Sequence, residues 1–250
     1  MPIISAKRRT NDSFLLTGEI IGTCFSIGDD LMVTAGHIVK STLESETERV
    51  VGLVDREKKF LKAAPIIEVE RLRCDLAIVR LDFMFEESAN WMHVLRWNRH
   101  PLSMFDQVKT LGYPHGLHNV DDRQLVIQRA MQGHIVSAPN LFKPIGFEGD
   151  PFGVYELSFQ APSAISGSPL LWGPNEPLIS GLIIGNSISR MLVLQMEEYE
   201  EGAGEKTIIE QYESLAMGIA VRQTEIFNTN SDILGKTFLE YLEEKSLLVR

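Results

Sequence analysis

The chain has 250 residues, 44 % of them apolar, and a formal net charge of −10, which suits one large domain or two small domains around a full hydrophobic core. The negative charge argues against nucleic acid as the main partner, because phosphate backbones bind clustered Lys and Arg and the one basic cluster is the short run at residues 6–9. Residues 1–14 lack the apolar core of a secretory signal, and no run of 18 apolar residues predicts a membrane span, so we expect a soluble cytoplasmic protein with no membrane partner.

Short apolar or alternating runs, bounded by Gly, Asp, Asn or Pro, predict strands along most of the chain. These runs are residues 18–27, 31–39, 49–54, 64–70, 75–81, 107–113, 153–159, 177–185, 191–196 and 215–221. Gly28, Asp29 and Asp30 separate the first two runs, which predicts a hairpin. The polar segment 98–106 divides the strands into two groups, and we interpret it as a linker.

The end of the chain has a helical pattern. Leu234, Phe238 and Leu242 recur every four residues behind the capping stretch 230–232, which predicts a terminal amphipathic helix. Many short strands followed by one helix predict an all-β barrel or sandwich. Residues 197–213 contain seven Glu and one Lys, and we expect this segment to be a solvated surface loop.

Three residues match the groups that activate a serine hydroxyl. A serine needs an imidazole to take its proton and a carboxylate to orient that imidazole. His37 stands at the mouth of an apolar strand, and Ser166 is followed by Gly167, which permits close backbone approach. Asp75 begins a run that is typical of a core strand, where an unpaired carboxylate is costly, so we expect Asp75 to be paired. Taken singly, each residue also fits a strand edge, a turn or a strand start.

The cysteines and histidines of the sequence do not have the spacing typical of a disulfide framework or a metal site. Cys24 and Cys74 have neither a disulfide framework nor zinc-type spacing, so we expect buried reduced thiols. The other five histidines follow no ligand spacing, namely His93, His100, His115, His118 and His134. We expect no metal and no cofactor.

These motifs, taken in succession, resemble the trypsin/chymotrypsin-like serine peptidases, and among them the bacterial HtrA-like protease domains without a PDZ domain. The resemblance covers residues 15–245 and rests on residues 22–39, 74–81, 108–116, 132–138, 163–171, 178–186 and 217–221. It implies two antiparallel β-barrels packed face to face. The N-terminal barrel, residues 1–100, would carry His37 and Asp75; the C-terminal barrel, residues 101–228, would carry Ser166; residues 229–250 would form the helix.

The resemblance also implies a role for each site residue. Ser166 would be the nucleophile, with Ser163 and Ser168 as scaffold. His37 would be general base and then general acid, while Asp75 would hold its tautomer and stabilise the imidazolium. The backbone N–H groups of Ala164 and Ser166 would form the oxyanion hole. The reaction would be hydrolysis of a protein or peptide substrate through an acyl-enzyme.

The sequence departs from the family at two positions in this loop. Ala164 stands where the family usually has glycine, and a positive φ there would cost about 1–2 kcal/mol. We therefore hypothesise an oxyanion hole that is partly collapsed at rest and is restored by substrate or by an activating protein partner. Ile165 replaces the aspartate that pairs with a newly cut N-terminus in secreted members, so activation by N-terminal trimming is not expected.

The specificity pocket would involve five residues: Gln160, Ile184, Gly185, Asn186 and Gly218. None is charged, which favours a small, apolar or neutral polar side chain before the scissile bond. The acidic segment 197–213 would lie near this pocket and attract a basic substrate or partner. Two other functions remain open, namely a catalytically weak or inactive protein-binding module and a partner-activated effector of a bacterial defence system. The oligomeric state is left open.

Overall fold

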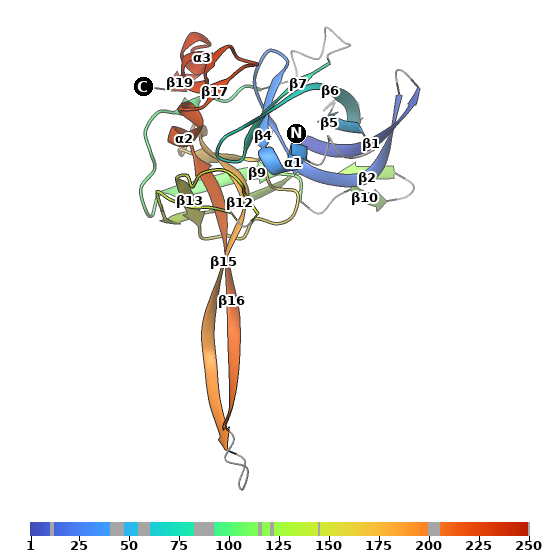
Figure 1. Ribbon diagram of the computed structural model, residues 1–250. Helices are drawn as coiled ribbons and strands as arrows, with labels where there is room; N and C mark the ends of the chain where they lie inside the picture. Colours follow the sequence, from blue (N-terminus) through green and yellow to red (C-terminus); the bar gives the residue numbers. More distant parts are fainter. Residues whose placement is uncertain are drawn as a thin grey trace.

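Strands form most of the molecule and build two large sheets that pack beside each other (Figure 1). The computed structural model describes residues 1–10, 13–40, 48–54, 61–82, 93–114, 117–120, 123–144, 146–199 and 206–249. Among these residues, no helix is long and apolar enough to cross a membrane.

The first large sheet comes from the N-terminal part of the chain. Its order is β2-β1-β5-β6-β7-β4-β3, and all neighbours are antiparallel. The strands are β1 (Pro2–Thr10), β2 (Ser13–Thr23), β3 (Phe25–Gly28), β4 (Leu31–Ala35), β5 (Glu48–Val54), β6 (Leu61–Leu72) and β7 (Leu76–Leu81). Gly28 (φ +112°) and Asp29 (φ +50°) turn the chain between β3 and β4, which confirms the predicted hairpin.

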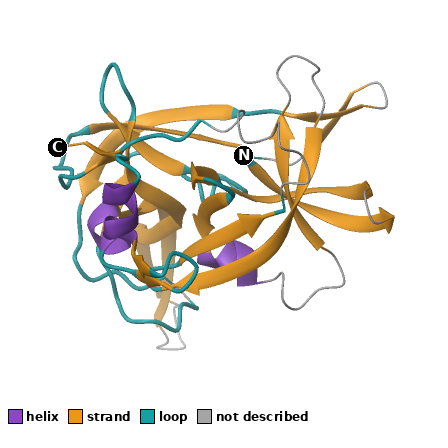
Figure 2. Cartoon of the chain, turned by 90° about the horizontal axis from the view of Figure 1, so that it is seen from above, coloured by secondary structure: helices purple, strands orange, loops and turns teal. Residues whose placement is uncertain are grey.

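The second large sheet has the order β14-β9-β12-β13-β16-β15-β8-β19, and β14 also pairs with β15, so that its first six strands close into a barrel. Its strands are β8 (Trp97–Asn98), β9 (Gln107–Gly112), β12 (Arg129–Ser137), β13 (Val154–Leu157), β14 (Pro169–Trp172), β15 (Leu178–Tyr199), β16 (Lys206–Arg222) and β19 (Leu248–Val249). The other strands of the described residues form two small hairpins: β10 (Leu117–Val120) with β11 (Arg123–Val126), and β17 (Asn230–Ser231) with β18 (Lys236–Thr237). The predicted all-β, double-barrel fold is confirmed (Figure 2).

In the described ranges, three short helices accompany the strands: α1 (Gly36–Lys40), α2 (Gln223–Phe227) and α3 (Phe238–Glu244). The terminal helix predicted for residues 229–250 is therefore correct in kind but wrong in both bounds, because α3 begins at Phe238 and ends at Glu244, and Leu248–Val249 form β19. Thr237 caps α3, in a capping box with Glu240. The segment expected to cap it instead contains β17, and the backbone N–H groups of Asp232 and Ile233 donate to the Glu70 carboxylate at 2.7 and 3.1 Å. These bonds to β6 take the place of a helical turn.

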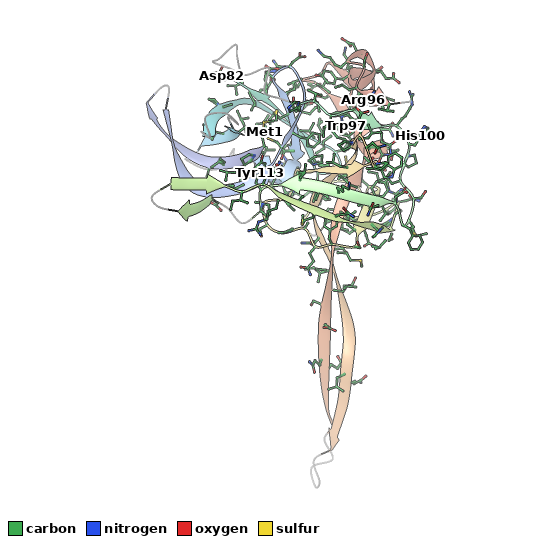
Figure 3. The ribbon with its side chains drawn as sticks, turned by 180° about the vertical axis from the view of Figure 1, so that it is seen from behind. Met1, Asp82, Arg96, Trp97, His100 and Tyr113 are labelled. Atoms are coloured by element: carbon green, nitrogen blue, oxygen red, sulfur yellow. The ribbon has the colours of Figure 1, made fainter. Side chains whose placement is uncertain are left out.

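An aromatic cluster joins the two sheets. Trp97, from β8, is fully buried, and its ring centroid lies 5.2–5.9 Å from those of Phe25, Phe227 and Phe238 (Figure 3). These rings come from the first sheet, the second sheet, α2 and α3, so one apolar core spans all four. β8 lies before residue 100, yet it pairs in parallel with β15 and β19 of the second sheet.

Strands β15 and β16 continue beyond the barrel as a long two-stranded arm (Figure 1). Their pairing begins inside the barrel at Gly181–Arg222, and the part beyond the barrel runs from Ser187–Met217 to Tyr199–Lys206, which at 3.3 Å per residue spans about 40 Å. Residues 197–199 and 206–213 belong to these strands, so the expectation of an acidic surface loop is wrong for them; residues 200–205 lie outside the described part. In this arm, residues 207–209 pair with residues 196–198.

Candidate active site

His37 is held by the helix that follows β4. It lies in the first turn of α1, rather than at the end of a strand as predicted. The N–H of Gly36 donates to the Asp75 carbonyl at 2.7 Å. A Cβ on Gly36 would lie 3.1 Å from Asp75 Oδ1, so glycine permits α1 to approach the Asp75 turn this closely.

Asp75 binds His37 through both carboxylate oxygens. Oδ1 accepts from the backbone N–H of His37 at 2.8 Å, and Oδ2 lies 2.7 Å from the ring Nδ1. The Asp75 side chain is 9 % exposed and the imidazole 44 % exposed. The predicted pairing of Asp75 is confirmed. An ionised carboxylate only accepts, so Nδ1 carries the proton in the neutral ring and Nε2 is left as the basic nitrogen.

The Asp75 turn is conformationally costly. Cys74 and Asp75 both have positive φ, at +54° and +55°, a region that non-glycine residues occupy at a cost. The turn connects β6 to β7, and its carbonyl and carboxylate groups bind Gly36 and His37. Backbone strain of this kind persists where surrounding contacts fix the conformation.

Ser166 lies in a loop of the second barrel that is anchored on the first sheet. The N–H of Thr23 donates to the Ser166 carbonyl at 2.8 Å, and Thr34 Oγ1 donates to the Thr23 carbonyl at 2.7 Å. A Cβ on Gly167 (φ +86°) would lie 1.9 Å from the Thr23 oxygen, so the expected close backbone approach at Gly167 is confirmed. Thr34 belongs to β4, which leads directly into α1 and His37.

Ala164 has a φ of +68°. A residue with a Cβ adopts this backbone conformation at a cost of about 1–2 kcal/mol. Its carbonyl accepts from Thr23 Oγ1 at 3.0 Å. Among the described residues, the backbone N–H groups of Ala164 and Ser166 have no protein acceptor, whereas those of Ile165, Gly167 and Ser168 each donate to a carbonyl. Two unsatisfied donors are thus presented by one loop, an arrangement suited to binding an oxyanion.

A cleft of about 800 Å³ opens beside His37 and Asp75. Of the predicted pocket residues, Ile184 and Asn186 line it. Five other predicted site residues lie outside its lining: Gln160, Ala164, Ser166, Gly185 and Gly218. The Asn186 side chain accepts from the Ala161 N–H at 2.7 Å and donates to the Ala161 carbonyl at 2.8 Å, so it holds the neighbouring loop in place.

Sequence reasoning missed the basic residues of this cleft. Four cationic side chains line it: Lys40, Arg71, Arg73 and Lys143. Arg71 and Arg73 precede Asp75 by four and two residues, and this spacing on a strand end was a readable signal. Lys40 and Lys143 come from a helix end and a loop, where no pattern marked them.

Both cysteines are free and buried, as expected. Burial raises the pKa of the Cys24 thiol to about 11 and that of the Cys74 thiol to about 12. At neutral pH both groups are protonated, and a protonated thiol is a poor nucleophile. Neither thiol is therefore suited to act as the nucleophile of the site.

The raised thiol pKa values predict slow modification. In the folded protein at about pH 8, neither Cys24 nor Cys74 is expected to react with Ellman's reagent over minutes, because the thiolate fraction and the access are both low. Both should react within the mixing time in denaturant. Fast release of thionitrobenzoate from the folded protein would contradict the buried, protonated state.

The chain is similar in sequence to one known protein family and in fold to a solved protease structure. A family model described as a trypsin-like peptidase domain matches residues 22–174. No curated protein matches significantly. The apo protease domain of MamO from Magnetospirillum magneticum is 13 % identical, with a TM-score of 0.52 over 90 % of this chain and 93 % of that chain. An inactive serine-to-alanine mutant of Rv3671c from M. tuberculosis H37Rv is 17 % identical, with a TM-score of 0.49 over 90 % and 82 %. The likeness to MamO is one of fold.

Proposed function

The chain belongs to the trypsin-like peptidase family, and from this premise we propose that it is a serine endopeptidase that cleaves protein substrates through an acyl-enzyme. The observation that carries the proposal is the contact between the His37 ring and the buried Asp75 carboxylate at 2.7 Å. The HtrA-like branch is part of the proposal and is supported by the succession of motifs along the sequence.

In the proposed mechanism, His37 Nε2 takes the proton of the Ser166 hydroxyl as Oγ attacks the substrate carbonyl. The free N–H groups of Ala164 and Ser166 donate to the developing oxyanion. Asp75 stabilises the imidazolium, which then gives its proton to the leaving amine. Water hydrolyses the acyl-enzyme with His37 again as base.

A fluorophosphonate probe tests the proposed function. The wild-type protein should be labelled covalently, and the label should be lost in Ser166→Ala. Ser163→Ala is the matched control, because Ser163 is an exposed serine of the same loop, and it should keep the label. Labelling that survives in Ser166→Ala would overturn the assignment of the nucleophile.

A second candidate is a protein that cleaves only after a partner binds, or that binds without cleaving. The positive φ at Ala164 favours it, because a strained residue in the oxyanion loop lowers the stability of the conformation that catalysis needs. Labelling by the probe only after a partner is added would support the partner-activated form. Labelling under no condition would support the binding module.

The Ala164 hypothesis makes a quantitative prediction. Ala164→Gly removes a Cβ from a positive-φ position, so basal hydrolysis of a peptide should rise roughly five- to thirtyfold if the strain opposes the competent loop. Ala130→Gly is the control, because Ala130 lies in β12 outside the positive-φ residues, and it should change the rate little. Unchanged or lower turnover in Ala164→Gly would count against a strained resting loop.

We also propose that the protein acts in the cytoplasm, a setting that the two free cysteines support. The proposed division into two barrels of one peptidase unit rests on the two sheets. An activating protein partner is proposed on the strain at Ala164.

A further inference from the structure

The cleft beside His37 carries an excess of positive charge, although the chain as a whole has a net charge of −10. Four cationic side chains line it, Lys40, Arg71, Arg73 and Lys143. The two carboxylates in the lining belong to Asp75 and Glu148. Since Asp75 is already bound to His37, Glu148 is, among the described residues, the one lining carboxylate left to offset these four cations.

Within the described part of the chain, three of the four cations have no ion-pair or hydrogen-bond partner, namely Lys40, Arg71 and Lys143. The fourth, Arg73, has its Nη2 3.2 Å from Glu225 Oε2. Elsewhere on the surface, Arg96, Arg99, Lys236 and Lys245 each contact a carboxylate. Like charges that converge on one cleft without partners raise the local concentration of anions.

The walls between these cations are apolar. Five apolar side chains line the cleft: Leu72, Phe142, Phe147, Ile184 and Ile188. The Phe147 ring is braced edge-on by Phe152, with the ring centroids 5.4 Å apart. An extended peptide with an apolar side chain against these walls would bring its neighbouring side chains to the cations.

We propose that the cleft selects protein segments in which Asp or Glu flanks an apolar residue; this rests on the peptidase function proposed above. The opposite preference, for basic substrates, depended on the acidic segment 197–213 lying near the pocket. Its described residues, 197–199 and 206–213, instead belong to the arm that leads away from the barrel (Figure 1), so we base the charge preference on the cleft cations.

A binding measurement tests the preference without relying on turnover. The whole chain with Ser166→Ala is titrated against fluorescent peptides that share an apolar core and differ in flanking Glu, Gln or Lys. Fluorescence anisotropy should show the Glu peptide binding about tenfold more tightly than the Lys peptide at low salt, with the ratio shrinking as salt screens the charges. Equal affinities, or tighter binding of the Lys peptide, would overturn the proposal.

Charge-reversal variants locate the effect. In the same Ser166→Ala background, Arg71→Glu with Lys143→Glu should abolish or invert the preference. Lys109→Glu with Arg129→Glu makes the same charge change at exposed positions outside the cleft lining and should preserve it. A preference that survives the first pair would overturn the role of the cleft. Wild-type protein that hydrolyses all three peptides equally would overturn the selectivity while leaving the peptidase function standing.

Discussion

Replacing Ser166 with alanine is expected to lower kcat for a peptide substrate by on the order of 10⁵-fold. Without the hydroxyl, no acyl-enzyme forms, and His37 has no nucleophile to activate. The residual rate would come from the oxyanion donors and from substrate binding alone. Initial rates with an internally quenched peptide measure the loss, and circular dichroism checks that the variant is folded.

The matched control for this loss is Ser163→Ala. Ser163 is exposed and lies in the same loop, so its removal should leave kcat within about twofold, as surface substitutions usually do. If Ser166→Ala kept more than a tenth of the wild-type rate, another residue would have to be the nucleophile. The buried, protonated thiols of Cys24 and Cys74 are poor candidates for that role.

The second large effect is expected from Asp75→Asn, which should lower kcat by about 10⁴-fold. In the wild-type protein, Asp75 Oδ1 accepts from the His37 backbone N–H at 2.8 Å, and Oδ2 lies 2.7 Å from Nδ1. In the variant, the asparagine carbonyl can still accept from that backbone N–H. The asparagine NH₂ group then faces Nδ1 and forces this nitrogen to accept. The proton moves to Nε2, which can no longer take the serine proton.

Steady-state kinetics and a pH–rate profile separate this effect from unfolding. Asp150→Asn is the control, because Asp150 is exposed and lies outside the cleft lining, and its rate should stay near that of the wild type. An Asp75→Asn protein with wild-type thermal stability and a rate within tenfold of the wild type would remove Asp75 from the proposed mechanism.

Local patterns in the sequence predicted the strands well, because their signals are short-range. The run 75–81 alternates little, which predicts a buried core strand, and residues 76–81 form β7, an inner strand of the first sheet. Gly28 and Asp29 predicted the β3–β4 hairpin because both tolerate positive φ. The pairing of Asp75 followed from the cost of burying a lone carboxylate.

Features that depend on tertiary contacts were less predictable. The start of α3 was misplaced because Glu70, more than 160 residues earlier, binds the segment that was expected to cap it. The arm was mistaken for a loop because its charge outweighed its β-branched residues in the prediction. The cleft cations come from three separate places in the sequence, and only folding brings Lys40 and Lys143 to Arg71 and Arg73.

The loop around Ser166 shows what sequence can and cannot say about strain. Gly167 and Ala164 both have positive φ, yet glycine occupies only one of these positions. At Gly167 a side chain would collide with the Thr23 carbonyl, so glycine is required there. At Ala164 the cost is conformational, and a folded loop can sustain it. The sequence showed that Ala164 stands where the family usually has glycine. The structure adds that φ is positive at this position, so the alanine carries a conformational cost.

Trapping the acyl-enzyme is the decisive test of Ser166 as the nucleophile. Wild-type protein turning over an activated ester is quenched in acid, and mass spectrometry of the intact chain and of its proteolytic fragments locates the adduct. We expect one acyl group, on the Ser166 hydroxyl, that is absent from Ser166→Ala. Turnover without any adduct, or an adduct on another residue, would contradict it.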